Sequence, residues 1–124
     1  MKYTQLIALG VALLTLAGTA GAGQPVTRDD GVTVIHLDEY NGYFAAEETL
    51  AGLKAGEYEF VVTNKSEKLV GFLIQNFKTH EQLDMFPLEP GETRTSRVTV
   101  TTDGVRYRCP INVTPWYDLD LVKN

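Results

Sequence analysis

The chain has 124 residues, a formal net charge of −5 and a single cysteine. This length suits one domain with one hydrophobic core. The excess of acidic residues argues against binding to nucleic acid, or to an anionic membrane, through neutralisation of phosphates. A single cysteine excludes an intrachain disulfide.

The first 22 residues are expected to be a cleaved signal peptide. Lys2 supplies a positive start, and residues 6–17 form an apolar stretch that is short for a membrane span. Ala20-Gly21-Ala22 gives the pattern of small residues that signal peptidase recognises. We therefore expect one domain at residues 23–124, located in the periplasm or secreted, with no membrane anchor after signal removal.

The rest of the chain has short segments rich in β-branched and aromatic residues, separated by turn-forming residues. Residues 47–54 are expected to form a brief helical turn, and residues 76–86 a helical turn or an irregular segment. Asp103-Gly104 predicts a hairpin between the two strands that flank it. The strands are expected at residues 32–37, 43–45, 57–63, 69–75, 93–101, 105–109 and 117–122.

The strand at residues 93–101 has a clear alternation, with Ser96, Val98 and Val100 on one face. Six to eight short strands with frequent turns and no long helix predict an all-β fold. The expected architecture is a Greek-key β-sandwich.

Three segments in the second half of the chain resemble those of a known family. Residues 54–64 read KAGEYEFVVTN, residues 88–93 read LEPGET, and residues 103–110 read DGVRYRCP. In this order and spacing they resemble the cupredoxins, particularly the exported cupredoxin-like domains of bacteria. The resemblance implies a sandwich of cupredoxin type, with Cys109 at the start of the family's cysteine–proline ligand loop.

A blue-copper site needs a thiolate and two imidazoles, usually with a weak axial methionine. By the resemblance, Cys109 is the thiolate, and Val70 stands where the first histidine is expected. No histidine or methionine follows Cys109 in the sequence. We therefore expect no standard blue-copper site and no cofactor, with Val70 and Trp116 filling the volume that the metal would occupy.

A rearranged copper site is the alternative. His80 and Met85 precede the proline–glycine turn, which the resemblance places near the Cys109 end of the sandwich. Thiolate, thioether and imidazole together suit Cu(I). The competing interpretation makes His80 a solvated loop residue and Met85 a core-filling one. Cys109 is then a buried inert thiol, a metal ligand, or the site of a redox or intermolecular bridge.

The aromatic pair Trp116-Tyr117 follows a proline in the last part of the chain. Large aromatic residues at the end of a sandwich either cap the core or anchor a partner protein. Val70, Trp116 and Tyr117 are therefore the candidates for a binding surface or a plug of the former metal site.

Motifs for catalysis are missing from the sequence: there is no Gly-x-Ser-x-Gly elbow, no His-Glu-x-x-His and no phosphate-binding glycine loop. We predict a non-enzymatic accessory or binding domain that acts with a periplasmic or respiratory partner protein. The resemblance adds a metal-handling context. The alternative function is a copper protein for electron transfer or metal delivery that uses Cys109 with His80 or Met85.

Overall fold

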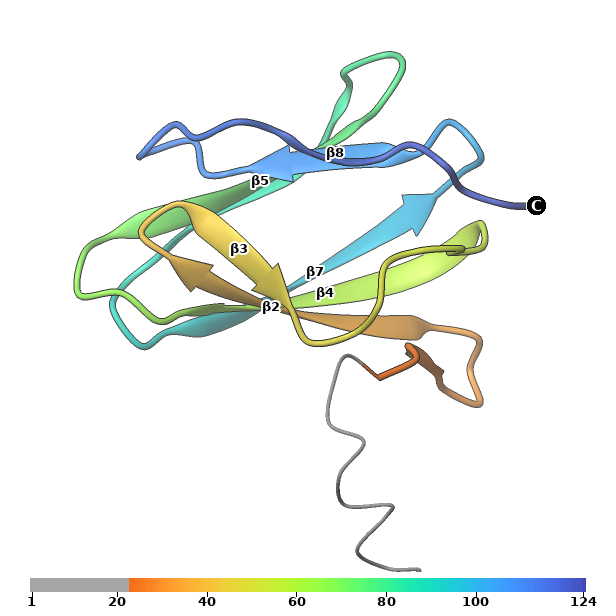
Figure 1. The fold of residues 1–124 in the computed structure, drawn as a ribbon, viewed down its shortest axis with the longest axis horizontal. Helices are drawn as coiled ribbons and strands as arrows, with labels where there is room; N and C mark the ends of the chain where they lie inside the picture. The colour runs from red at the N-terminus through yellow and green to blue at the C-terminus, as the bar shows by residue number, and fades with distance from the viewer. Residues whose placement is uncertain (1–22) are drawn as a thin grey trace, which may run out of the picture.

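The computed structural model describes residues 23–124, so the expected signal peptide at residues 1–22 lies outside the described residues. The described residues form nine strands in two sheets and no helix. The two sheets face each other as the layers of a β-sandwich (Figure 1). The all-β sandwich prediction is confirmed, with nine strands in place of six to eight. In this part of the chain there is no helix that could cross a membrane.

The first sheet has five strands. Its order is β1-β2-β4-β7, and β3 pairs with β2 on the same edge as β1. The β2–β4 pair is parallel and the other pairs are antiparallel. The strands are β1 (Val26–Thr27), β2 (Thr33–Tyr40), β3 (Tyr43–Ala46), β4 (Gly56–Asn64) and β7 (Thr93–Val100).

The second sheet has four antiparallel strands in the order β6-β5-β8-β9. Leu73 of β5 pairs with Met85 of β6 on one side and with Arg108 of β8 on the other. The strands are β5 (Val70–Asn76), β6 (Gln82–Leu88), β8 (Val105–Arg108) and β9 (Tyr117–Leu119).

Three local predictions are wrong. Residues 47–54 form turns without a helix, as their glycine-limited sequence allows. The segment at residues 76–86 contains most of β6, an edge strand, where charges and Pro87 are tolerated because one edge needs no hydrogen-bonded neighbour. Asp103-Gly104 joins β7 to β8, which belong to different sheets, so this turn connects the layers and closes no hairpin.

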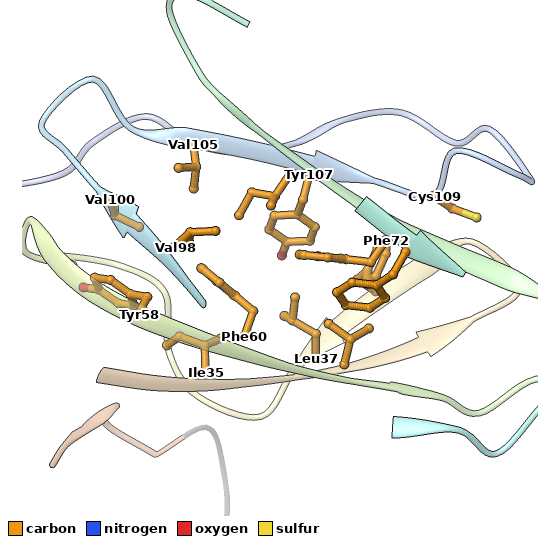
Figure 2. Packing of buried hydrophobic residues seen from close by; sticks show 14 of the residues in the cluster. Ile35, Leu37, Tyr58, Phe60, Phe72, Val98, Val100, Val105, Tyr107 and Cys109 are labelled. Carbon is orange, nitrogen blue, oxygen red and sulfur yellow. The ribbon is translucent and has the colours of Figure 1, made fainter. Parts of the chain in front are cut away.

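The core lies between the two sheets (Figure 2). Because side chains alternate along a strand, Ser96, Val98 and Val100 of β7 are buried together, as predicted. The ring centroids of Phe72 and Phe60 lie 6.3 Å apart. Burying one such side chain contributes about 1.5–3 kcal/mol. The buried residues of the cluster include Ile35, Leu37, Tyr58, Phe60, Val62, Val70, Phe72, Ile74, Phe86, Leu88, Val98, Val100, Val105, Tyr107 and Cys109.

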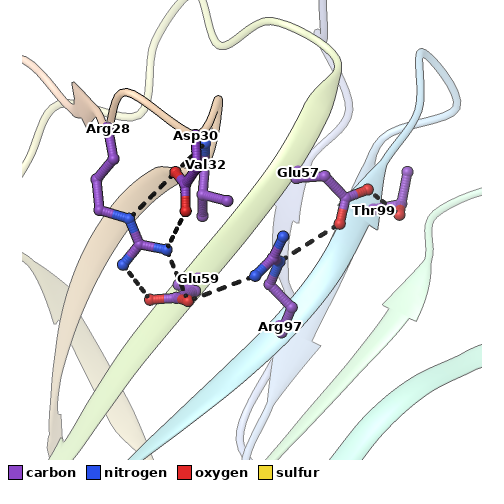
Figure 3. Close-up of polar contacts among 7 residues, drawn as sticks. All are labelled: Arg28, Asp30, Val32, Glu57, Glu59, Arg97 and Thr99. Carbon is purple, nitrogen blue, oxygen red and sulfur yellow. Dashed lines mark hydrogen bonds and ion pairs between the residues drawn. The ribbon is translucent and has the colours of Figure 1, made fainter.

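The outer face of the five-stranded sheet carries paired charges (Figure 3). Arg28 contacts Asp30 at 3.2 Å and Glu59 at 3.0 Å. Arg97 contacts Glu57 at 3.4 Å and Glu59 at 3.7 Å. Both arginines of this network are thus neutralised by carboxylates on their own sheet.

Candidate functional site

Cys109 directly follows β8 and is fully buried at one end of the core (Figure 2). It continues the inward-facing series of Val105 and Tyr107, because every second residue of a strand points to the same side. The backbone N–H of Asn112 donates a hydrogen bond to Cys109 Sγ at 3.3 Å. The loop after β8 therefore contacts the sulfur through its backbone.

Glu39 places a carboxyl group inside the same part of the sandwich. It continues the inward-facing series of Ile35 and Leu37 on β2, and its exposed fraction is 0%. Neither carboxylate oxygen has a hydrogen-bond partner of normal geometry among the described residues. Burial raises the pKa of Glu39 to about 7, and the interaction with the Cys109 thiol opposes part of this rise. Glu39 and Cys109 thus form a buried carboxyl–thiol pair.

The loop after Cys109 closes this end of the sandwich. The side-chain amide of Asn112 donates to Asn41 O at 2.6 Å, and Thr114 Oγ1 donates to Gly42 O at 2.7 Å. Asn41 and Gly42 form the two-residue turn between β2 and β3, with φ of 53° and 101°. A Cβ on Gly42 would lie 2.8 Å from Asn112 O, so the loop and the turn approach closely.

Val70 begins β5 and is fully buried next to Leu88, its partner on β6. Asn64, at the end of β4, donates hydrogen bonds to Lys68 O at 2.8 Å and to Leu88 O at 3.0 Å. Asn64 is also the register partner of Glu39. The position expected for a first histidine is therefore occupied by an apolar core residue.

His80 and Met85 are placed away from the Cys109 thiol. His80 lies in the loop beyond the end of β5, whereas the pairing of Leu73 with Arg108 puts Cys109 toward the start of β5. Met85 pairs with Leu73 on the outward-facing side of the sheet and is 50% exposed. Residues 23–124 contain no cluster of three or more His, Cys, Asp or Glu side chains able to hold a metal. The donors near Cys109 therefore do not fit a blue-copper ion.

Trp116 and Tyr117 lie on opposite faces of the four-stranded sheet. Tyr117 faces inward and stacks on Tyr107, with ring centroids 5.2 Å apart. Trp116 lies on the outer face, where the guanidinium carbons of Arg106 and Arg108 lie 4.0 and 4.1 Å from its ring centroid. Both arginines alternate with buried residues of β8, which fixes them on the outer side.

This placement separates the three residues predicted to form a binding surface or a plug of the site. Val70 is in the core and Tyr117 packs against it, whereas Trp116 is partly exposed on the other side of the sheet. Trp116 therefore does not share the interior with Cys109.

Arg94, Arg106 and Arg108 form no salt bridge with any carboxylate of residues 23–124. Arg106 donates to Gln75 Oε1 at 3.0 Å, and Arg94 lies 4.9 Å from the Phe86 ring centroid. The Nε of Arg108 is buried without a hydrogen-bond partner in the described chain. Arg94 belongs to β7 of the five-stranded sheet, whereas Arg106 and Arg108 belong to β8 of the four-stranded sheet, opposite the paired Arg28 and Arg97.

An open apolar pocket of about 320 Å³ lies at the β6 end of the same face. Met85 and Ile111 contribute side chains that are 50% and 49% exposed. We call the surface formed by this pocket, Trp116 and the two arginines of β8 the arginine–tryptophan face. The pocket is lined by Met85, Phe86, Pro87, Pro110 and Ile111, and the arginine–tryptophan face adds Arg106, Arg108 and Trp116.

Sequence reasoning missed Glu39, because it ended the strand at Leu37 and assigned the following residues to a turn. The sequence did contain a signal, because Ile35, Leu37 and Glu39 are every second residue and therefore point to the same face of the strand. The pairing of both arginines with one indole was also missed. It depends on the register of β8 and β9, which the sequence does not specify.

No protein-family model matches the chain, and a search of curated proteins finds no match. The functional assignment therefore depends on the chain's own residues.

Proposed function

We propose that this protein is an exported, non-enzymatic domain of cupredoxin type that binds a partner protein through the arginine–tryptophan face. The cupredoxin type is supported by two positions. Val70 begins β5 after the turn at Asn64, and Cys109 directly follows β8, as the resemblance implies. Sheet neighbours that are not consecutive in sequence, such as β5 and β8, support a Greek-key arrangement.

Export is supported by the charged start, the apolar stretch and the small residues of the first 22 positions. The resemblance favours a partner from a metal-handling or respiratory system.

The observation that carries the proposal is the stacking of Arg106 and Arg108 on Trp116 beside an apolar pocket. Tryptophan, arginine and methionine are the residue types enriched in the energetically important parts of protein interfaces. The indole holds both guanidinium groups in place, so little side-chain freedom remains to be lost when a partner binds. Such pre-organisation favours tight contact.

The charges of this face specify the chemistry of the partner. Within residues 23–124, neither Arg106 nor Arg108 forms a salt bridge, although Asp118 is the register partner of Arg106. Carboxylates of a partner could pair with these guanidinium groups in bidentate geometry. The pocket between Met85 and Ile111 would accept an apolar side chain. The partner surface is therefore an apolar residue flanked by aspartate or glutamate.

The overall net charge of −5 restricts where an acidic partner can bind. An acidic partner is repelled by the rest of the surface and attracted by the arginine–tryptophan face. Electrostatic complementarity of this kind sets orientation and association rate, and added salt weakens it.

A peptide selection tests the partner chemistry. The reduced protein is screened against a random peptide library, and binding of the selected peptides is followed by the fluorescence of Trp116, the only tryptophan in the chain. We expect selected peptides to contain an apolar residue next to acidic ones, and to change the emission of Trp116.

The matched variants are Arg106→Glu with Arg108→Glu, and Arg28→Glu with Arg97→Glu on the other sheet. The first pair should abolish peptide binding, and the second should leave it unchanged. Selected peptides without acidic residues, or equal binding by both double variants, would contradict the proposal.

A further inference from the structure

Glu39 has a buried carboxyl group for which the fold provides no partner. Its exposed fraction is 0%, and neither oxygen has a hydrogen bond of normal geometry within residues 23–124. Folded proteins pair nearly all of their buried polar groups, because a buried carboxylate without partners loses the hydration that it has in water. An uncharged carboxyl loses much less. The protonated form of Glu39 is therefore the form that this interior accepts.

The strands on either side of Glu39 offer no charge to offset a carboxylate. Its register partners are Phe44 on β3 and Asn64 on β4, and neither side chain ionises. The backbone N–H of Lys65 donates to Glu39 O at 2.8 Å, but Lys65 itself is exposed. None of the salt bridges of residues 23–124 includes Glu39.

The facing sheet supplies only acids to the core. Its inward-facing titratable groups are the Tyr107 and Tyr117 phenols and the Cys109 thiol. Each of these groups is neutral with its proton and negative without it, so none supplies a positive charge. Burial accordingly raises the pKa of Glu39 to about 7.

The turn that follows Glu39 holds the loop after β8. The side-chain amide of Asn112 donates to Asn41 O at 2.6 Å, and Thr114 Oγ1 donates to Gly42 O at 2.7 Å. These two carbonyl oxygens belong to the β2–β3 turn, two and three residues after Glu39. A change of backbone position at Glu39 therefore acts directly on both hydrogen bonds.

We call residues 110–116 the clamped loop. A third hydrogen bond, from the backbone N–H of Asn112 to Cys109 Sγ at 3.3 Å, fastens this loop to the core. The clamped loop also carries Ile111 and Trp116, which belong to the arginine–tryptophan face. The positions of these two side chains thus depend on contacts that lie next to Glu39.

We propose that Glu39 is a proton-controlled latch for the clamped loop. While the carboxyl keeps its proton, the loop stays bonded to the β2–β3 turn. When the proton leaves to solvent, the carboxylate draws water into this end of the core and the loop is released. The release is local, because the Phe44 N–H donates to Tyr117 Oη at 3.0 Å and keeps β3 joined to β9.

The proton and the three hydrogen bonds have effects of similar size. One such hydrogen bond shifts an equilibrium by a factor of about 2–12, so three favour the closed loop by a factor of about 10–2,000. The pKa of Glu39 is about 7 in the closed form, against 4.5 for an ordinary glutamate. This difference favours the open form by up to about 300-fold. Opening therefore increases as pH rises from 4.5 to 7 and levels off above 7.

Release of the clamped loop regulates the arginine–tryptophan face, and this part of the inference rests on the proposed function. Ile111 and Trp116 lose their fixed positions when the loop opens. The apparent affinity for a partner falls in proportion to the closed fraction. The protein therefore binds its partner more tightly at acidic than at alkaline pH.

Amide hydrogen exchange measured by NMR tests the latch without a partner. The reporter is the Asn112 N–H, and its rates are divided by the intrinsic exchange rates at each pH. We expect the opening equilibrium at Asn112 to rise by at least about tenfold between pH 5 and pH 8. The Phe60 N–H in the central strand β4 should stay at least about tenfold better protected, because it opens only with global unfolding. Equal protection of the two amides would overturn the local release.

Glu39→Gln keeps the shape of the side chain and cannot ionise. It should remove most of the pH dependence at Asn112. Asp38→Asn is the matched control, since Asp38 is the adjacent residue of β2 on the opposite face of the strand, and it should keep that dependence. A pH-independent opening in the wild-type protein, or a full pH dependence retained in Glu39→Gln, would overturn the latch.

Carbon NMR of the wild-type protein decides if circular dichroism shows that Glu39→Gln does not fold. The rise in opening at Asn112 should level off at the pH where the Glu39 carboxyl resonance titrates. A rise that continues well beyond that pH would overturn the latch.

Peptide affinity separates the latch from the proposed function. A selected acidic peptide should bind the wild-type protein at least about threefold more tightly at pH 5.5 than at pH 8, whereas Glu39→Gln should bind it equally at both. Equal wild-type affinities would overturn the regulation. An absence of peptide binding at both pH values would contradict the proposed function, and exchange at Asn112 would still decide the latch.

Discussion

The side chain of Asn112 donates a hydrogen bond of 2.6 Å to the main-chain oxygen of Asn41. This contact ties the loop after β8 to the tight turn between β2 and β3. The same loop positions Cys109 inside the sandwich and Ile111 on its surface. The interior carboxyl–thiol pair and the arginine–tryptophan face are therefore held by one segment of the chain.

Gly42→Ala should destabilise the protein more than Gly31→Ala. Both glycines have positive φ, 101° and 88°, so each alanine costs roughly 1–2 kcal/mol of backbone strain. A Cβ at Gly42 also lies 2.8 Å from Asn112 O, whereas a Cβ at Gly31 meets nothing within 4 Å. Overpacking adds about 1–3 kcal/mol at Gly42. Urea unfolding measures both values, and equal losses would contradict the close approach.

Glu39→Gln should remove part of the pH dependence of stability. The pKa of Glu39 is about 7 in the folded state and about 4.5 in the unfolded state. The folded state therefore retains a proton that the unfolded state loses between these values. Its stabilising contribution is complete below pH 4.5 and is lost as pH rises from there through 7, by about 3 kcal/mol.

Urea unfolding between pH 5 and pH 8 measures this effect. The wild-type protein should lose stability across the range, and Glu39→Gln should lose less. Other groups contribute equally to both proteins, so the difference between the two slopes isolates Glu39. Parallel slopes would show that the carboxyl is not desolvated.

Trp116→Ala should cost less stability than Tyr107→Ala. Trp116 is on the outer face, where each cation–π contact contributes about 0.5–1 kcal/mol, so the expected loss is about 1–2 kcal/mol. Tyr107 is 2% exposed in the core, and its truncation should cost about 3–5 kcal/mol. Chemical denaturation compares the two. A loss as large as that of Tyr107 would mean that the indole fills the interior.

Glu48→Gln should lower the pKa of His36. Glu48 Oε2 lies 2.6 Å from His36 Nδ1, and this hydrogen bond raises the pKa of the imidazole. The stabilisation from this pair is present below the unfolded pKa of about 6.5 and is lost as pH rises through the folded value. NMR titration of the His36 ring protons measures the shift. Glu57→Gln is the control, and an identical His36 titration in both variants would contradict the assignment.

Much of the fold could be predicted from the sequence, because alternation and turn residues specify short strands. The buried series of Ser96, Val98 and Val100 is one example. The strand β6 was missed because Asp84 and Pro87 interrupt its apolar pattern, which an edge position permits. The turn at Asp103-Gly104 resembles a hairpin turn locally, and only the packing of two layers sends β8 to the other sheet.

The candidate site was less predictable. Cys109 was recognised from its proline-flanked motif, but its partner Glu39 is distant in sequence and meets it only when the sheets face each other. The same holds for Trp116, whose outer position follows from pairing of Tyr117 with Tyr107. The alternation of side chains along each strand could have been read from the sequence. Which side chains meet depends on the strand register, which could not.

Photo-crosslinking in the exporting cell tests most directly whether the arginine–tryptophan face binds a partner. A photoreactive phenylalanine is placed at Ile111, and in a matched protein at Thr95, which is exposed on the other sheet. The proposed function predicts a discrete protein adduct from Ile111 that disappears with Arg106→Glu and Arg108→Glu, and no such adduct from Thr95. Equal adducts from both positions, or an Ile111 adduct that survives reversal of both arginine charges, would contradict it.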